Sequence, residues 1–189
     1  MCLALSADDT KIFTGHNGGT LLMLDVKQPI VIKDFENIHK SCLLSVQCTT
    51  DSKYIITCDN LGNMKQWDLN EEIYTPVKND DENYKINCVN NYQTCHKNGI
   101  NLAELTHDNR YIITADEGGE LKKFNLETYE LVKEFLYFNE TNNQQEHYYT
   151  GLCIGQGDRD LVTSDTQGTI LLWNLRTAQI MREFKASYM

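Results

Sequence analysis

The sequence lacks long apolar runs and has few basic residues. No apolar stretch approaches the roughly 18 residues of a membrane-spanning helix, so we expect no membrane partner. Its 17 basic residues are outnumbered by 27 acidic ones, which gives a net charge of −10. No basic stripe is present, and this excludes nucleic acid as a general partner. The acidic balance itself needs no explanation beyond solubility. Asp8 and Asp9 interrupt the first apolar residues, so we expect no cleavable signal.

Motifs for metal, cofactor or phosphate binding are also missing. There is no Cys-x-x-Cys pair and no phosphate-cradling glycine loop, and Cys95-His96 has no second pair at zinc-ligand spacing. The seven cysteines are odd in number and fall mostly within apolar segments. Reduced thiols in an intracellular compartment are the simplest interpretation. We therefore expect no cofactor, no metal and a cytoplasmic location, with a nuclear or cytoskeleton-associated one as the alternative.

What the chain does contain is one pattern, four times. Two apolar residues, a threonine and a small residue lead into a polar turn that ends in glycine. A second apolar run follows and ends in a large side chain. The glycines are Gly19, Gly62, Gly119 and Gly168, each where a turn requires positive φ. The closing residues Leu24, Trp67, Phe124 and Trp173 are separated by 43, 57 and 49 positions.

The repeat extends beyond this hairpin. A polar turn lies six residues before each threonine, at Asp8, Asp51, Asp108 and Gly157. Residues 31–35, 131–135 and 180–184 share an apolar pair, a basic and an acidic residue and a final phenylalanine. Both faces of the second strand are apolar and must be covered. Each unit is therefore predicted to be a meander of four short strands.

These units resemble the WD-repeat β-propeller family. Trp67-Asp68 matches the family signature, Trp173-Asn174 and Phe124-Asn125 are near matches, and Leu24-Asp25 keeps only the carboxylate. His39 and His96 match the histidine near the start of a repeat. In the last repeat Gln145 stands at that position, with His147 two residues away. The resemblance covers residues 3–184 and implies an all-β fold of four-stranded antiparallel blades. It assigns structural roles to His39, Trp67, Asp68, His96, Phe124, Asn125, Trp173 and Asn174.

The family links its histidine, a serine or threonine, an aspartate and the tryptophan in a hydrogen-bond relay. The aspartate directly before the turn glycine is absent here in all four copies, and an acid stands two residues earlier in three of them. These acids are Asp59, Asp116 and Asp165. The resemblance therefore implies only a partial relay in this chain.

The predicted domain is a single propeller segment, 1–189. Its blades span about 1–38, 39–80, 96–138 and 147–185, with inserted loops at about 78–95 and 139–146. The first strand is expected to direct Leu3 and Leu5 inward. Neither end supplies a strand to the opposite terminal blade, which predicts an incomplete propeller or open arc. Three arrangements stay open: part of a longer propeller, a pair with another partial propeller or a further copy of itself, and a ring of four blades.

The predicted function is a non-catalytic scaffold for other proteins. Candidate partner-binding residues are Asp59, Asn60, Asp116, Glu117, Asp165 and Arg176, although the three aspartates could instead cap their own turns. His39 and His96 could face Thr57 and Thr114 as a catalytic base would, but a turn-tying role is favoured. As an alternative function, Trp173-Asn174-Leu175-Arg176 resembles the box that docks some propellers onto the adaptor of a cullin ubiquitin ligase.

Overall fold

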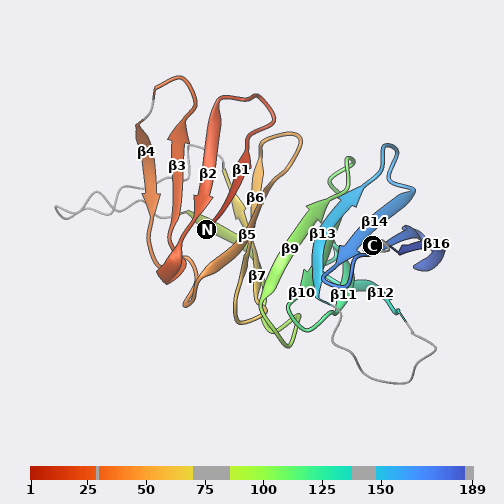
Figure 1. Ribbon diagram of the computed structural model, residues 1–189. Helices are drawn as coiled ribbons and strands as arrows, with labels where there is room; N and C mark the ends of the chain where they lie inside the picture. The colour runs from red at the N-terminus through yellow and green to blue at the C-terminus, as the bar shows by residue number, and fades with distance from the viewer. Residues whose placement is uncertain (29, 70–85, 138–147, 186–189) are drawn as a thin grey trace. The chain divides into compact units, whose positions relative to one another are not determined.

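Apolar strands separated by polar turns build the whole described part of the chain. The structure, a computed structural model, describes residues 1–28, 30–69, 86–137 and 148–185. These residues form four antiparallel sheets of four strands each, so the predicted all-β fold of propeller blades is confirmed (Figure 1). Their single helix is the three-residue 3-10 helix η1 (Asn17–Gly19), and none of the described helices could therefore span a membrane.

In every blade the strands follow one another in chain order. Blade 1 consists of β1 (Cys2–Leu5), β2 (Lys11–Gly15), β3 (Leu21–Asp25) and β4 (Val31–Phe35). Blade 2 consists of β5 (Leu43–Cys48), β6 (Tyr54–Asp59), β7 (Met64–Asp68) and β8 (Asn87–Tyr92). Blade 3 consists of β9 (Ile100–Leu105), β10 (Tyr111–Asp116), β11 (Leu121–Asn125) and β12 (Leu131–Phe135). Blade 4 consists of β13 (Tyr149–Ile154), β14 (Asp160–Asp165), β15 (Thr169–Asn174) and β16 (Gln179–Lys185).

The outer strand of blade 2 is not where the sequence pattern placed it. We expected blade 2 to end near residue 80 and assigned 78–95 to an inserted loop. Instead β8 lies within that range and pairs with β7, Met64 opposite Tyr92 and Asp68 opposite Asn87. Residues 70–85 lie outside the described residues, as do 139–146, the second expected insertion.

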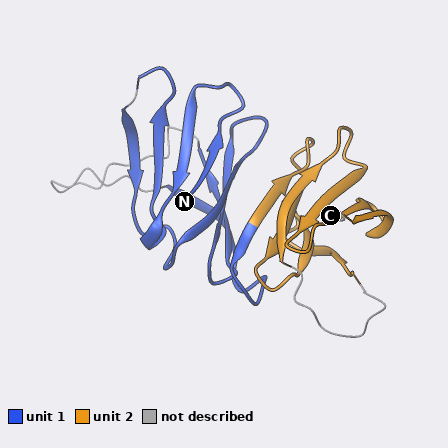
Figure 2. Cartoon of the chain, in the orientation of Figure 1, with its two compact units in different colours: residues 1–101 blue, residues 102–189 orange. Residues whose placement is uncertain are grey.

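The chain divides into two compact units, residues 1–101 and 102–189 (Figure 2). In the first unit the core fills the space between blades 1 and 2. It is formed by Phe13, Leu21, Met23, Phe35, Ile38, Leu43, Val46, Ile55 and Trp67. Cys2 and Ala4 pack against this core. Leu3 and Leu5, expected to point inward, are instead 68% and 48% exposed, because they lie on the opposite face of the same strand.

In the second unit the core lies between blades 3 and 4. Phe135, which ends β12, packs edge-on against Trp173 of β15, with ring centroids 5.6 Å apart and planes at 90°. Around this pair lie Ile113, Ala115, Leu121, Tyr149, Ile154, Leu161, Leu171 and Leu175. The aromatic that closes a hairpin thus becomes the centre of an interface between blades.

Neighbouring blades of a unit are also joined between the turns that connect their first and second strands. Ser52 Oγ of blade 2 accepts a hydrogen bond from Ala7 N of blade 1 at 3.0 Å. In the second unit Asp158 of blade 4 accepts from His107 of blade 3, 3.0 Å from its backbone N and 2.8 Å from its Nδ1. Ser52 and Asp158 occupy the same left-handed position of their turns, with φ of 55° and 53°. One joint therefore recurs in both units.

Candidate functional site

Three of the four turns between second and third strands begin with a buried aspartate. Asp59, Asp116 and Asp165 are the last residues of β6, β10 and β14. Each Oδ1 accepts hydrogen bonds from the backbone N–H groups two and four residues further on, at 2.7–3.0 Å. A buried carboxylate thereby satisfies the turn's own donors. The turn-capping interpretation of these residues is confirmed.

In blade 2 the aspartate also completes a relay. Trp67 Nε1 donates to Thr57 Oγ1 at 2.8 Å. The Thr57 hydroxyl donates to His39 Nε2 at 2.7 Å, and His39 Nδ1 donates to Asp59 Oδ2 at 2.9 Å. The donor directions follow from the carboxylate, which can only accept. Our expectation of a partial relay was wrong for this blade, because the acid two residues early reaches the histidine from the strand end.

The other blades keep fragments of this arrangement. In blade 4, Trp173 Nε1 donates to Thr163 Oγ1 at 2.9 Å, while Gln145 and His147 lie outside the described residues. In blade 3, Phe124 is buried but has no N–H to donate. In blade 1, Thr14 Oγ1 bonds instead to His16 Nε2, at 2.8 Å. In blade 3 the change from an indole to a phenyl ring thus removes one bond of the relay, while the strand pairing is retained.

Burial and hydrogen bonding set the charges of the blade 2 relay. Burial lowers the pKa of His39, and this effect exceeds the opposing influence of Asp59. Burial alone would raise the pKa of Asp59, but hydrogen bonds from His39 and Asn63 more than offset it and lower that pKa well below its usual range. At neutral pH the relay therefore contains a neutral imidazole and a carboxylate.

In the turns between second and third strands of the first unit, a glycine leaves room for a later segment of the chain to pass close to the turn. Gly19 and Gly62 have φ of 76° and 75°, and a Cβ on either would clash with the carbonyl oxygen of His39 or His96, respectively. Their carbonyls accept hydrogen bonds from the backbone N–H groups of those histidines, at 3.3 Å each. Both family-matched histidines are thus fixed to the turn of a glycine that precedes them in the chain.

The same segment ties the turns of blades 1 and 2 into one edge. Leu43 N donates to His16 O at 3.2 Å, and Asn60 N donates to Cys42 O at 3.0 Å. We call residues 16–20, 37–42 and 59–63 the turn edge of the first unit. The buried Asp59 cannot be offered to a partner there, whereas Asn60 and Leu61 at the tip are exposed.

In the second unit the candidate residues divide in the same way. Asp116 and Asp165 are buried and bonded within their turns, while Glu117 is exposed. Asn60 and Glu117 are therefore accessible to a partner, whereas the side chains of the three aspartates are taken up by their turns. The exposed Leu61 did not stand out in the sequence, because an isolated leucine in a turn carries no periodic signal.

The Asp or Asn after the closing residue has a separate structural task. Asp25, Asn125 and Asn174 accept hydrogen bonds at Oδ1 from the backbone N–H groups two and three residues later, at 2.7–3.0 Å. Asp68 is the last residue of β7. In the Trp173–Arg176 box, Trp173 and Leu175 are buried and Arg176 is exposed.

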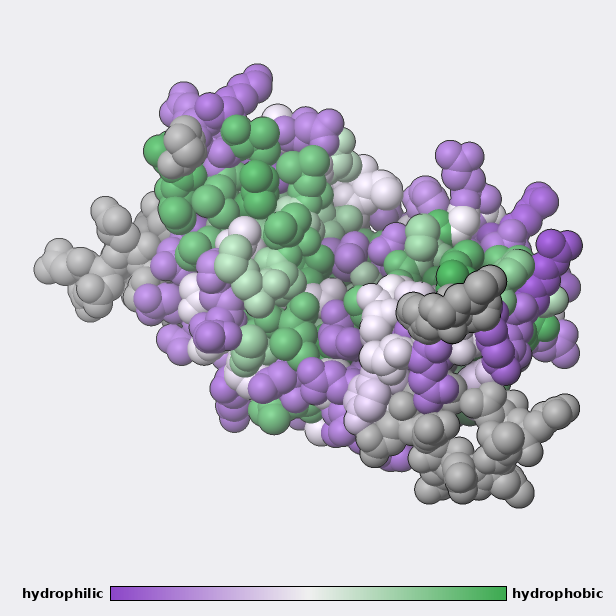
Figure 3. Space-filling view, viewed as in Figure 1, coloured by the Kyte–Doolittle hydropathy of each residue, from purple (hydrophilic) through white to green (hydrophobic). Residues whose placement is uncertain are grey.

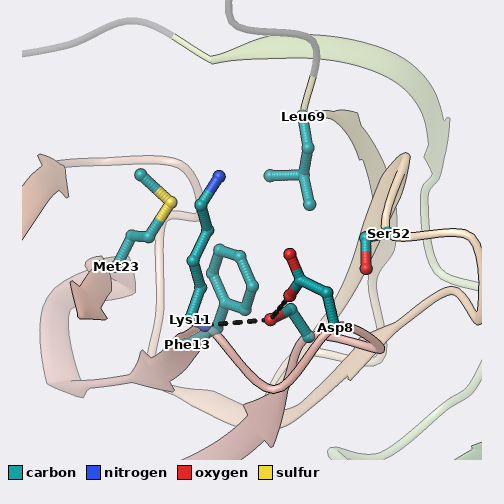
Figure 4. Close-up of a pocket in the computed structure, with 7 residues that line it drawn as sticks. Asp8, Lys11, Phe13, Met23, Ser52 and Leu69 are labelled. Atoms are coloured by element: carbon teal, nitrogen blue, oxygen red, sulfur yellow. Dashed lines mark hydrogen bonds between the residues drawn. The ribbon is translucent and has the colours of Figure 1, made fainter. Parts of the chain in front are cut away.

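A small pocket lies between the two blades of the first unit, beside the Ser52 joint (Figure 4). Phe13, Met23 and Leu69 form apolar walls, and Asp8 and Lys11 lie at its polar side. Ser6 Oγ donates to Asp8 Oδ1 at 2.5 Å, and this bond with those from Thr10 lowers the pKa of Asp8 to about 2. The cavity of about 40 Å³ has room for roughly one water molecule and not for a metabolite.

The relay also bears on chemistry. Thr57, His39 and Asp59 are spaced like a nucleophile, a base and an orienting carboxylate. All three are buried, and Thr57 Oγ1 already accepts the indole N–H of Trp67. Because no substrate can approach Thr57 in this geometry, the arrangement positions a turn.

Four meandering antiparallel sheets of four strands each define a β-propeller class of fold. Among solved structures, the β-propeller domain of Cps50 (Swd1) from Myceliophteria thermophila matches with a TM-score of 0.78 over 98% of this chain. The sequences are 14% identical, so the likeness shows the fold alone, and this chain spans 55% of that one. No protein-family model and no curated protein matches the sequence.

Proposed function

We propose that this protein is a WD-repeat propeller segment that serves as a non-catalytic scaffold for binding other proteins. The observation that carries the proposal is the complete relay of blade 2, in which Thr57 links His39 and Trp67, both picked out by the resemblance, and Asp59 completes the relay from the strand end. The relay uses up the polar groups inside the turn and fixes its backbone. Such turns present side chains from a rigid support, which favours binding over chemistry.

The turn edge of the first unit supplies the best-defined binding surface. Leu61 is 56% exposed at its tip, and Asn17, Lys40 and Asn60 are exposed on the same edge. An apolar side chain ringed by polar ones is the usual composition of a protein-binding site. In the second unit we assign the equivalent role to Glu117. The seven free thiols favour the cytoplasm as the location.

Protein capture tests this surface. A tagged chain carrying Asn60→Arg and Leu61→Asp should lose partners that the natural sequence retains, because both side chains are exposed and neither supports the fold. Lys53→Glu is the matched control, since Lys53 is exposed in the turn between β5 and β6. Specific partners lost only from the double variant support the proposal. The same partners recovered with all three chains, or none with any, contradict it.

The ubiquitin-ligase alternative has less support. The fold accounts for Trp173, Asn174 and Leu175 without a ligase, because two are buried and the third caps its turn. Arg176 stays a prediction as a partner contact. Co-purification of a cullin adaptor that disappears in Arg176→Ala would favour this function over the turn-edge scaffold.

A further inference from the structure

Two neighbouring blades contribute different sheet faces to the interface between them. The chain has a further copy of each of these faces that packs on no other blade of its unit. The second face of a blade is the one that packs on the following blade, and the first face is the one that packs on the preceding blade. Within both units, the second face of one blade packs on the first face of the next. In the second unit Leu121 and Phe135 of blade 3 supply the second face, and Leu161 and Trp173 of blade 4 supply the first face. The first face of blade 1 and the second face of blade 4 take part in neither of these two interfaces.

Blade 4 shows its unused half by exposure. Phe184 of β16 pairs with Ile170 of β15, as Phe135 pairs with Leu121 in blade 3. Phe135 is 3% exposed, and its equivalent in blade 1, Phe35, is 0% exposed, whereas Phe184 is 52% exposed. A side chain that this repeat buries in the other blades that carry it is therefore presented to solvent here.

Blade 1 shows the complementary half. Ile12 pairs with Leu24 in blade 1, as Leu161 pairs with Trp173 in blade 4. Leu161 and Trp173 are buried, but Ile12 and Leu24 are only half-buried. Figure 3 shows hydrophobic side chains gathered over the strands of blade 1. An apolar sheet face of this kind usually marks an association surface.

Polar groups on the two outer faces have opposite signs. Asp34 lies opposite Leu22 on the blade 1 face, and its buried Oδ1 has no hydrogen-bond partner among the residues that the structure describes. Arg182 lies opposite Leu172 on the blade 4 face, is exposed, and forms no ion pair within the described part of the chain. A carboxylate that needs a donor and a free guanidinium are complementary across an interface.

The hydrogen bond that joins neighbouring blades between these turns also has an unused acceptor position in blade 1 and an unused donor position in blade 4. Asp9 has a φ of 56° and holds in blade 1 the acceptor position that Ser52 and Asp158 hold in blades 2 and 4. Its side chain is exposed and accepts no hydrogen bond from the described residues. Gln156 of blade 4 holds the donor position of Ala7 and His107, and it too is exposed.

We propose that copies of this chain associate head to tail, with the outer face of β13–β16 of one copy packed on the outer face of β1–β4 of the next. A second copy is the partner because the two faces are complementary. Both present apolar side chains, Asp34 and Arg182 carry opposite charges, and Asp9 and Gln156 hold the acceptor and donor positions of the hydrogen bond between turns. The size of the similar propeller agrees, since one copy of this chain accounts for only 55% of it. This association uses other surfaces than the turn edge and does not depend on a protein bound there.

Two single variants and their mixture test this arrangement. In sedimentation at about 0.15 M salt, the natural sequence should be heavier than the 21.8 kDa of one chain. Leu5→Asp blocks the blade 1 face and Phe184→Asp blocks the blade 4 face, so each variant alone should be monomeric. Mixed together they should form a species of two chains, since each contributes the face that the other has lost. Glu127→Lys, in an exposed turn on neither face, should leave the assembly unchanged.

The outcomes separate clearly. A natural chain that stays at 21.8 kDa at about 100 µM overturns the proposal, because then another segment or partner covers these faces. A single variant that still dimerises shows contacts between like faces and overturns the head-to-tail order, and so does a mixture that stays monomeric. If either variant fails to fold by circular dichroism, Asp34→Lys and Arg182→Glu provide the same three-way comparison through the charges on the two faces.

Discussion

At the scale of single residues, blade 2 is organised around the hydroxyl of Thr57. It accepts from Trp67 and donates to His39, so one buried atom links two strands and the preceding loop. Both partners are themselves buried, and neither has water to replace the hydroxyl. The relay is therefore a local determinant of stability.

Thr57→Val keeps the shape of the side chain and removes both hydrogen bonds. We expect it to lower the free energy of unfolding by about 2–4 kcal/mol, because two buried polar groups lose their partner. Urea unfolding followed by tryptophan fluorescence measures the change. Thr166→Val, at an exposed turn residue, should alter it by less than about 0.5 kcal/mol. Equal effects of the two substitutions would refute the role of the relay.

The relay also predicts how stability depends on pH. Because burial lowers the pKa of His39, the unfolded chain binds a proton near pH 6.5 that the folded chain does not yet bind. Stability from this residue is therefore complete above pH 6.5 and declines as the pH falls toward the folded pKa. Asp59, whose pKa is also lowered, adds a further loss as the pH falls through 3.8.

We test the histidine contribution by comparing the natural chain with His39→Gln in urea unfolding between pH 7.5 and pH 5. The natural chain should lose stability more steeply, by at most one proton, or about 1.4 kcal/mol per pH unit. The difference between the two slopes isolates His39 from the other histidines. Parallel slopes would mean that His39 has the same pKa in the folded and unfolded chains.

Predictions for single residues succeeded where a position has a physical requirement that one residue type meets best. Gly62 and its three equivalents have positive φ, as the turn pattern required. Prediction failed at Asp59, because the expected relay aspartate was sought directly before the glycine. An aspartate at a strand end can cap a turn and reach a histidine twenty residues back, and no spacing along the chain reveals that second contact.

At the scale of elements, the turn glycines serve two distinct purposes. Gly18 and Gly62 both have left-handed backbones, with φ of 77° and 75°. A Cβ on Gly18 meets none of the described residues within 4 Å, whereas a Cβ on Gly62 would clash with the backbone of His96. Comparing them separates the conformational cost of a side chain from its steric cost.

We therefore expect Gly18→Ala to cost about 1 kcal/mol, the ordinary cost of a left-handed alanine. Gly62→Ala should cost about 2–4 kcal/mol, since the crossing segment must also move. Thermal and urea unfolding of both variants measure the difference. Equal costs would show that the loop carrying His96 yields freely, and that the turn does not fix it.

Strand-level prediction was accurate for the two central strands of every blade and failed at β8. The central strands carry apolar pairs and end in turns of fixed chemistry, so their pattern repeats. The outer strand of blade 2 reads Asn87-Cys88-Val89-Asn90-Asn91-Tyr92, and only Tyr92 is buried. An exposed outer strand has little hydrophobic signal, and its position was therefore taken from the spacing of the other repeats.

At the scale of the whole molecule, the repeat gives a single copy of the chain more blade faces than it can pack against one another. Every blade is built with a face for the blade before it and a face for the blade after it. Leu5 and Phe184 belong to faces that the same pattern buries in other blades, and the buried Oδ1 of Asp34 has no donor within the described part of the chain. The sequence predicted an open arc, but it did not show which side chains are exposed, because the repeats themselves look equivalent.

Association through these faces would couple stability to concentration. If copies pack head to tail, assembly stabilises the folded state by mass action, so the Tm of the natural chain should rise over a hundredfold range of protein concentration. Phe184→Asp removes the apolar anchor of one face, and its Tm should be independent of concentration. Glu127→Lys, which changes charge on neither face, should follow the natural chain. A Tm that is constant for all three would place the stabilising contacts entirely within one copy, and the exposed Phe184 would then need a partner of another sequence.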